Sequence, residues 1–402
     1  MRYPFADRVK KFKSSAVRDI LSVIQKGDVI SFAGGMPFED FFPNEAVERA
    51  FSKVFQSGKS SMQYGLTEGF MPLRELLSDQ LKQQSMRFDA ENILLTTGSQ
   101  QAIDLFSRAM LSPGDVVLTE DPTYLAALQV FQSYEAEIIA VESDEDGMDP
   151  DDLEQKMRQY RPKFVYIVPT FSNPEGKVWS AERRQLLLNL AQRFNVLIFE
   201  DDPYGEIKFD DQKEFTPIAA FDEEGTHVVY TSTISKTVVP ALRIGWVAGP
   251  YQVIRMMAQV KQCSDLHSSS IDQQALYYLL QDFDLKGHIR MLREEYYKRM
   301  VIMQDYLKKI ESDSISWIEP QGGMFLWVTL GEQVDTTVLL MDAIKEGVAY
   351  VPGAPFYVAN PRVNTLRLNF THATPELIQL GMDRLTTVLN RLQPGNESPP
   401  IL

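Results

Sequence analysis

Short apolar runs alternate with longer amphipathic stretches through the middle of this chain of 402 residues. An apolar run rich in β-branched residues predicts a buried strand, and apolar residues at helical spacing predict a helix. The predicted strands are Ile93–Thr96, Val116–Thr119, Phe164–Val168, Val196–Phe199, Val228–Tyr230 and Ile244–Val247. Because these runs are almost continuously apolar and helices separate them, we expect an α/β fold with a mainly parallel sheet covered on both faces.

The pattern changes towards the two ends of the chain. Near the N-terminus, Ser15–Ile24 has apolar residues at helical spacing, which predicts an amphipathic helix. From about Asp282, a long charged helix (Lys286–Ile310) precedes further apolar runs, which is typical of a smaller α+β unit. We therefore predict an N-terminal segment (1–45) that joins the small domain, a large domain (46–281) and a C-terminal small domain (282–402).

Polar clusters come directly after most of the predicted strands. In open α/β sheets, ligands bind where the carboxyl ends of the strands meet, so we expect these clusters to share one site. The clusters are Gly98–Gln100, Glu120–Tyr124, Asn173–Pro174, Glu200–Tyr204 and the segment that ends at Lys236.

Lys236 ends a predicted strand among small hydroxyl residues, and Arg243 follows it closely. Burial and a neighbouring cation both favour the neutral amine, which is the form that attacks a carbonyl. Hydroxyl groups and a guanidinium also offer a seat for a phosphate beside that amine. A reactive amine next to a phosphate site suggests pyridoxal 5'-phosphate (PLP). On this segment alone, an ordinary lysine in a Thr/Ser-rich loop is the favoured interpretation, and the other clusters reverse that preference.

The composition narrows the classes of function. The formal net charge is -15, which disfavours a nucleic-acid partner. The single cysteine, Cys263, rules out an intramolecular disulfide and fits a cytoplasmic location. The four histidines have no metal-ligand spacing, so no metal is expected. No apolar run is long enough to span a bilayer and the N-terminus lacks a signal-peptide core, so no membrane partner is expected.

With these clusters in this order, the chain resembles the fold-type I PLP-dependent aminotransferases, and within them the 2-aminoadipate/kynurenine aminotransferase subgroup. The resemblance extends from Ser15 to Phe370. It implies a large domain with a seven-stranded, mainly parallel sheet and a smaller α+β domain built from both termini. It also implies a ping-pong transfer of an amino group from an amino acid to a 2-oxo acid such as 2-oxoglutarate, by a homodimer with shared active sites.

The resemblance assigns the central chemistry to three residues. Lys236 would carry PLP covalently and then act as the general base. Asp201 would pair with the pyridine nitrogen and keep it protonated, and Tyr204 would donate to the phenolic oxygen. Because Glu200 and Asp202 flank Asp201, a solvated acidic loop is the alternative interpretation of this segment.

The resemblance also names the other cofactor ligands. The phosphate ligands would be Ser99, Gln100, Thr233, Ser235 and Arg243, together with Tyr64 of the neighbouring subunit. A helix that begins at Ser99 would direct free N–H groups towards the phosphate, although Ser99 is equally typical of a helix cap. Tyr124 would stack on the pyridine ring, and Asn173 would bond the phenolic oxygen.

The substrate residues implied by the resemblance are Gly35, Asn173, Arg367 and Arg18. Arg367 would hold the α-carboxylate with both arms of its guanidinium, and a solvent-facing strand arginine is the alternative. Gly35 fits a backbone that approaches the substrate closely. Arg18 would meet a distal carboxylate, or would be only the polar side of the N-terminal helix. The expected donor is therefore 2-aminoadipate or glutamate, or a broad range that includes aromatic and aliphatic amino acids.

Two other classes of function remain open. One is a PLP-dependent lyase, decarboxylase or racemase, since Lys236, Asp201 and Asn173 would serve those reactions too. The other is a free-standing effector domain of an aminotransferase-like transcriptional regulator. The matching region starts by about Ser15, which leaves no room for a DNA-binding domain before it, and the acidic charge also disfavours this class.

Overall fold

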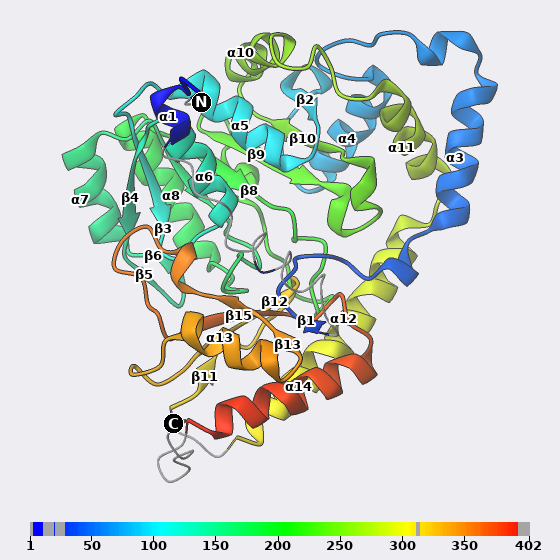
Figure 1. Cartoon of the computed structure of the whole chain (residues 1–402). Helices are drawn as coiled ribbons and strands as arrows, with labels where there is room; N and C mark the ends of the chain where they lie inside the picture. Colours follow the sequence, from blue (N-terminus) through cyan, green and yellow to red (C-terminus); the bar gives the residue numbers. More distant parts are fainter. Residues whose placement is uncertain (1–2, 11–19, 21–28, 311–313, 393–402) are drawn as a thin grey trace.

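A seven-stranded sheet forms the larger part of the molecule in the computed structural model, which describes residues 3–10, 20, 29–310 and 314–392 (Figure 1). Its strand order is β2-β10-β9-β8-β7-β3-β4. The strands are β2 (Ile93–Thr96), β3 (Val116–Glu120), β4 (Glu137–Val141), β7 (Phe164–Ile167), β8 (Leu197–Asp201), β9 (Val228–Thr233) and β10 (Gly245–Ala248). Neighbouring strands are parallel except at β10, which is antiparallel to both β2 and β9. The predicted fold class is confirmed.

Both faces of this sheet are buried because its strands send apolar side chains to each side in turn. In β7, Phe164 and Tyr166 join one core cluster, whereas Val165 and Ile167 join another. This alternation follows from the two-residue period of a strand. It explains why the predicted strands are almost continuously apolar.

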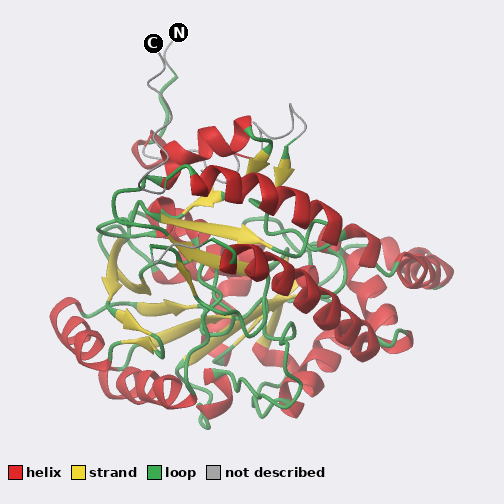
Figure 2. Cartoon of the chain, turned by 90° about the horizontal axis from the view of Figure 1, so that it is seen from below, coloured by secondary structure: helices red, strands yellow, loops and turns green. Residues whose placement is uncertain are grey.

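Helices cover the two faces of the sheet, and Figure 2 shows the strands inside the molecule with helices around them. One core cluster contains residues of α5 (Ser99–Met110), α6 (Leu125–Ser133) and α10 (Tyr251–Gln262). The other contains residues of α3 (Asn44–Gln56), α4 (Met71–Gln83), α7 (Pro150–Tyr160), α8 (Ala181–Phe194), α9 (Ile218–Phe221) and α11 (Ser270–Asp282). A short hairpin of β5 (Ser143–Asp144) and β6 (Gly147–Met148) precedes α7, and α1 (Asp7–Lys10) is a single turn.

A second, four-stranded antiparallel sheet forms the smaller part of the molecule, in the order β11-β12-β15-β14. These strands are β11 (Ser316–Trp317), β12 (Phe325–Thr329), β15 (Thr365–Asn369) and β14 (Val351–Pro352). They pack with α12 (Leu285–Lys308), α13 (Thr336–Lys345) and α14 (Pro375–Asn390) around another core cluster, which also includes Phe171, Tyr204 and Ile207 from the large domain. The predicted charged helix therefore corresponds to α12.

The N-terminal part of the chain joins this smaller unit. β1 (Ile30–Ser31) pairs in parallel with β13 (Val348–Ala349), and in Figure 1 the blue β1 lies near the orange and red elements. The residues of β1 therefore join the small domain together with the C-terminal part of the chain, whereas Arg8 of α1 interacts electrostatically with Tyr134 of the large domain. The exact division at residues 45 and 281 stays a prediction. The amphipathic helix expected over Ser15–Ile24 lies outside the described residues except for Ile20.

None of the helices in the described part of the chain is long and apolar enough to cross a membrane. Within the same residues, no group of three or more His, Cys, Asp or Glu side chains is arranged to hold a metal ion. Loops of the large domain surround a cavity at one edge of its sheet. They are the loops that follow β2, β3, β7, β8 and β9, and the cavity also borders β12 and β15.

Candidate functional site

The cavity at this edge of the sheet has a volume of about 320 Å³. Such a volume lies at the lower end of the range for small-molecule sites. Among the predicted site residues, the following line it: Gly35, Ser99, Gln100, Tyr124, Asn173, Asp201, Tyr204, Thr233, Ser235, Lys236, Arg243 and Arg367. Residues from both sheets therefore meet in one space, although they are far apart in the sequence.

Lys236 lies in a short 3-10 turn, Ile234–Lys236, directly after β9. Thr233 starts this turn because its Oγ1 accepts a hydrogen bond from the Ser235 N–H at 3.2 Å. The Lys236 Nζ donates to the Gly35 carbonyl at 2.8 Å. Burial, together with the charges of Arg243 and Arg367, lowers the pKa of Lys236 to about 8. A substantial fraction of this amine is therefore neutral at slightly alkaline pH.

Asp201 is the last residue of β8 and is 2% exposed. Its Oδ2 accepts a hydrogen bond from the Tyr166 hydroxyl at 2.8 Å, while its buried Oδ1 has no partner among the described residues. Burial raises the pKa of Asp201 to about 7. A buried carboxylate with one unpaired oxygen is suited to a cationic N–H group.

The two neighbouring carboxylates are also buried but already have donors. Glu200 accepts from the backbone N–H groups of Ile218 and Ala219, at 2.8 and 2.9 Å. Asp202 accepts from the Tyr230 hydroxyl at 3.0 Å and from a backbone N–H at 2.9 Å. The interpretation of this segment as a solvated acidic loop is therefore wrong. Of the three, only Asp201 lines the cavity.

An anion cradle is formed where β2 turns into α5. Gly98 is the N-cap of this helix, with φ of 75°, and Ser99 is its first residue. No side chain caps the helix, so the interpretation of Ser99 as a side-chain cap is wrong. The first N–H groups of a helix have no intrahelical partner and carry the positive end of its dipole. Ser99 and Gln100, the first two residues of α5, both line the cavity.

Arg243 and two hydroxyl residues complete this cradle. The Arg243 Nη1 donates to the Ser235 Oγ at 3.4 Å, and the Ser235 and Thr233 hydroxyl oxygens lie 2.8 Å apart. A Cβ atom on Gly98 would lie only 2.5 Å from the Arg243 Nη2, so glycine allows the guanidinium to approach the turn. A guanidinium, hydroxyls and a helix N-terminus together are suited to a phosphate.

Arg367 projects from β15 and is 3% exposed. It donates to the Asn173 Oδ1 at 2.5 Å and to the Ala33 carbonyl at 2.8 Å. Its guanidinium carbon lies 4.2 Å from the ring centroid of Phe325 and 5.1 Å from that of Phe356. The interpretation of Arg367 as a solvent-facing arginine is wrong, since all five residues of β15 are buried. A guanidinium held between two rings in a cavity is suited to a carboxylate.

Tyrosines line the space between these groups. The Tyr124 hydroxyl donates to the Gln100 Oε1 at 3.1 Å, and the Asn173 Nδ2 donates to the Tyr204 hydroxyl at 3.5 Å. Tyr204 is buried against Phe325, with the ring centroids 5.8 Å apart. The hydroxyl groups of Tyr124 and Tyr204 can form hydrogen bonds with a polar substituent on a bound ring, while the two tyrosine rings exclude water.

One predicted residue in the described part of the chain does not line the cavity. This residue, Tyr64, is 78% exposed, and its ring packs edge-on against His267 at 5.7 Å. Arg18 lies outside the described residues. The sequence reasoning also missed Tyr166, Phe325 and Phe356. Tyr166 and Phe325 lie within the apolar runs and look like ordinary core residues there, and Phe356 follows no periodic pattern.

Comparisons with known proteins agree with this arrangement. A family model described as "Aminotransferase class I and II" matches residues 28–385. The chain is 38% identical to aromatic-amino-acid aminotransferase 1 of Thermococcus litoralis, over 96% of this chain and 94% of that protein. It is 31% identical to 2-aminoadipate transaminase of Thermus thermophilus, over 96% and 97% of the two chains. The crystal structure of Pyrococcus horikoshii kynurenine aminotransferase matches with a TM-score of 0.91 and 38% identity, over 97% of this chain and 98% of that one.

Proposed function

Because this chain belongs to the class I and II aminotransferases, it is a PLP-dependent aminotransferase, and we propose that the cavity around Lys236 is its active site. One observation carries the proposal. The cavity combines a buried amine, an anion cradle and a buried carboxylate oxygen that no other described residue contacts by a hydrogen bond. PLP has an aldehyde, a pyridine nitrogen and a phosphate, which are the complementary groups.

The residues present fit the cofactor. Lys236 would hold it through its amine, Asp201 would accept from the ring nitrogen, and the cradle at Ser99 and Arg243 would hold the phosphate. Asn173 and Tyr204 would bond the phenolic oxygen, and Tyr124 would pack on the ring. When bound, PLP withdraws electrons from the substrate Cα and so acidifies its C–H bond. Asp201 strengthens that effect because a carboxylate beside the ring nitrogen keeps it protonated.

Lys236 would act as the general base. A base works best when its pKa lies near the working pH, and burial brings the pKa of Lys236 to about 8. Its Nζ would remove the proton from the substrate Cα and return it to the neighbouring carbon of the cofactor. The Gly35 carbonyl, which accepts from Nζ at 2.8 Å, would help to orient the amine.

Arg367 would hold the substrate α-carboxylate. Its Nε has no partner among the described residues, and its two Nη atoms already point to Asn173 and Ala33. These contacts fix the guanidinium plane before substrate binds, which lowers the entropy lost on binding. Gly35 lies beside Phe325 and leaves room for the substrate backbone.

The donor specificity follows from the cations in the cavity. Among the described lining residues these are Lys236, Arg243 and Arg367, and each already has a proposed role. The wall that remains includes Leu125, Val168 and Phe356, which suits aromatic and aliphatic side chains. We therefore propose a broad range of donors that includes aromatic and aliphatic amino acids. A substrate with a second carboxylate, such as the proposed acceptor 2-oxoglutarate or the donors 2-aminoadipate and glutamate, would need a further cation, which we assign to Arg18.

An Arg18→Ala variant separates these two substrate classes. It should raise KM for 2-aminoadipate and glutamate and leave KM for leucine and phenylalanine unchanged. Equal changes for all four donors would refute the role of Arg18.

The enzyme is also proposed to be a homodimer. Tyr64 is largely exposed, and Met62, Leu66 and Leu266 expose apolar surface near it in the sequence or in space. Exposed apolar residues gathered around one loop are typical of an interface. Tyr64 would reach the phosphate of the neighbouring subunit. A cytoplasmic location stays a prediction from the single cysteine.

The half-reaction tests the proposed function directly. The protein loaded with PLP is mixed with single amino acids, and its visible spectrum is followed without an acceptor. Loss of the cofactor's absorption with release of the matching 2-oxo acid supports amino-group transfer. Release of ammonia, loss of carbon dioxide or simple racemisation of the donor would instead identify a lyase, a decarboxylase or a racemase.

A further inference from the structure

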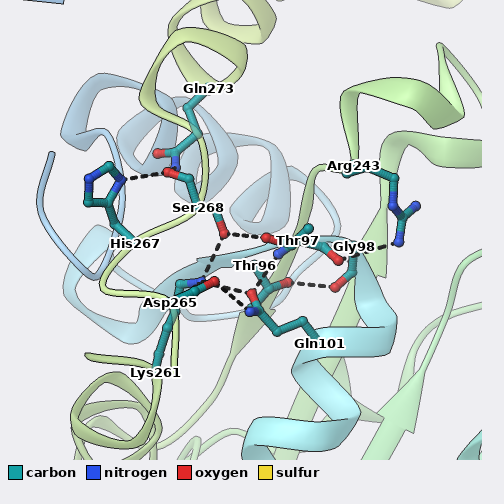
Figure 3. A network of polar contacts seen from close by, with 10 residues as sticks. All are labelled: Thr96, Thr97, Gly98, Gln101, Arg243, Lys261, Asp265, His267, Ser268 and Gln273. Atoms are coloured by element: carbon teal, nitrogen blue, oxygen red, sulfur yellow. Dashed lines mark hydrogen bonds and ion pairs between the residues drawn. The ribbon is translucent and has the colours of Figure 1, made fainter. Parts of the chain in front are cut away.

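A buried lysine lies behind the turn that starts α5. Lys261 is in the last turn of α10, and its side chain is 0% exposed. Its Nζ donates to the Gln101 Oε1 at 2.7 Å, to the Ser268 Oγ at 2.9 Å and to the Asp265 Oδ2 at 2.7 Å (Figure 3). An ammonium group has three protons, so these three acceptors satisfy it completely.

Gln101 connects this ammonium to the turn. Its Oε1 also accepts from the Thr97 N–H at 2.8 Å, and its Nε2 donates to the Asp265 Oδ2 at 2.6 Å. The Thr97 hydroxyl lies 2.8 Å from that of Ser268. Both the backbone and the side chain of Thr97 are therefore held by groups that Lys261 binds. Thr97 directly precedes Gly98 and Ser99, where the anion cradle begins.

The same network extends to the segment that follows Tyr64. The Ser268 carbonyl accepts from the Gln273 Nε2 at 2.9 Å, and the Gln273 Oε1 accepts from the Phe70 N–H at 2.7 Å. The His267 Nε2 accepts from the Gly65 N–H at 3.2 Å. Figure 3 shows His267, Ser268 and Gln273 to the left of the turn at Thr97 and Gly98.

We propose that Lys261 is a positioning residue for the cofactor phosphate. Through Gln101 and Thr97 it fixes the turn that directs the N–H groups of Ser99 and Gln100 into the cavity. This inference rests on the proposed role of that turn as the phosphate cradle. The physical reason is that preorganised donors bind an anion without reorganising, whereas a mobile turn would lose entropy on binding. A buried ion pair is a weak source of stability, so packing alone does not account for a lysine here.

The test is a Lys261→Met variant, which keeps an unbranched chain in place and removes the ammonium. Dissociation constants of the cofactor-free protein are measured for PLP, for pyridoxal and for inorganic phosphate. Affinity for PLP and for inorganic phosphate should fall about tenfold, the equivalent of about one charge-assisted hydrogen bond. Affinity for pyridoxal, which lacks the phosphate, should stay within about twofold. A matched control is Lys298→Met, which removes an exposed lysine and should change none of the three constants.

Other outcomes overturn the inference. An equal loss for PLP and pyridoxal, or a lower melting temperature with unchanged phosphate affinity, would make Lys261 a structural residue only. A Gln101→Leu variant tests whether Lys261 acts through Gln101. This variant should show the same loss of affinity for PLP and inorganic phosphate, and it replaces Lys261→Met as the test if Lys261→Met does not fold. The double variant should lose no more than either single one, and additive losses would exclude this route.

Failure of the proposed function is distinguishable from failure of this inference. Arg243→Ala is measured in the same assays. If it leaves the affinity for inorganic phosphate intact, the cradle itself is wrongly assigned. If it lowers that affinity while Lys261→Met does not, the cradle stands and the role of Lys261 falls.

Discussion

Burial controls the chemistry of the charged residues in the active-site cavity. It lowers the pKa of Lys236 to about 8 and that of Arg367 to about 10, and it raises the pKa of Asp201 to about 7. Each charged form is disfavoured because it has lost water. Groups of opposite charge would restore the lost interactions, which suits a carboxylate beside Arg367 and the protonated ring nitrogen of PLP beside Asp201.

An Arg367→Lys variant tests whether the planar, two-armed shape of the guanidinium matters separately from its charge. Lysine keeps a cation but cannot make the same planar contacts with a carboxylate or lie flat between the rings of Phe325 and Phe356. Loss of charge-assisted hydrogen bonds worth about 1.5–3 kcal/mol should lower kcat/KM by about 10- to 150-fold. Steady-state kinetics with several donors should show a similar factor for each of them, because all share the α-carboxylate. A loss confined to one donor would contradict this role.

Some residue assignments could be made from sequence and others could not. The three adjacent carboxylates at Glu200–Asp202 look equivalent in the sequence. They differ because successive residues of a strand point to opposite sides, and because the donors to Glu200 come from the distant α9. The aromatic pair around Arg367 was missed for a similar reason, since Phe325 and Phe356 come together only after the small domain folds.

At the scale of elements, the turn between β2 and α5 makes a specific demand on Gly98. Its φ is 75°, and an added Cβ would meet the Arg243 guanidinium at 2.5 Å. Gly114 is a matched control, because its φ is 84° but nothing lies within 4 Å of an added Cβ. Gly98→Ala and Gly114→Ala should each lose about 1 kcal/mol of stability from backbone strain. Only Gly98→Ala should also weaken binding of PLP and inorganic phosphate, by at least about tenfold, because it displaces a phosphate ligand.

Titration of both variants with inorganic phosphate, followed by intrinsic fluorescence or calorimetry, checks this expectation. Equal phosphate affinities in the two variants would mean that the contact with Arg243 is unimportant. Urea unfolding of each variant measures the loss of stability from backbone strain, which should be similar in the two variants.

The elements themselves were largely predictable, since a strand buried on both faces is recognisable from composition alone. The predicted strands correspond to β2, β3, β7, β8, β9 and β10, with ends that differ by a few residues. The exception in the large sheet is the edge strand β4, whose residues are mostly half-exposed. Its apolar run Ile138–Val141 was available as a signal. The order of the strands was not predictable, because pairing depends on crossovers that no local pattern encodes.

For the whole molecule, stability of the cofactor-free protein should depend on pH through Asp201. The pKa of Asp201 is raised in the folded state, so its contribution is fully present below its unfolded pKa of about 4 and is lost as the pH rises through about 7. Glu120 and Glu200, with pKa values of about 7, act in the same direction. Asp201→Asn should therefore reduce the fall in unfolding free energy between pH 5 and 8 by on the order of 2 kcal/mol.

Urea unfolding at several pH values measures this difference. Asp79→Asn, which changes an exposed carboxylate of α4, should retain the full dependence of the native protein. If Asp201→Asn and Asp79→Asn behave alike, Asp201 is not the group that titrates.

The proposed homodimer with shared active sites makes a quantitative prediction for mixed dimers. Lys236→Ala and Tyr64→Ala should each impair both sites of their own homodimer. In a mixed dimer, one site receives both substitutions and the other receives neither. When equal amounts of the two variants exchange subunits at random, half of the dimers are mixed and each mixed dimer has one intact site. The mixture should therefore regain about one quarter of the native activity. Mixtures that show only the sum of the two separate variants would exclude a shared site, and gel filtration of tagged subunits confirms exchange.

The pairing of Ile30 with Val348 also has a consequence for folding during synthesis. During translation β1 leaves the ribosome long before its partner strand exists, whereas the large sheet can already form from the residues made in between. Ala33, which accepts from Arg367, comes just after β1 and is placed only when that late partner arrives. Nascent chains released early would thus contain Lys236 but not Arg367, which is proposed to hold the substrate carboxylate. Only an almost fully synthesised polypeptide would therefore form a complete active site.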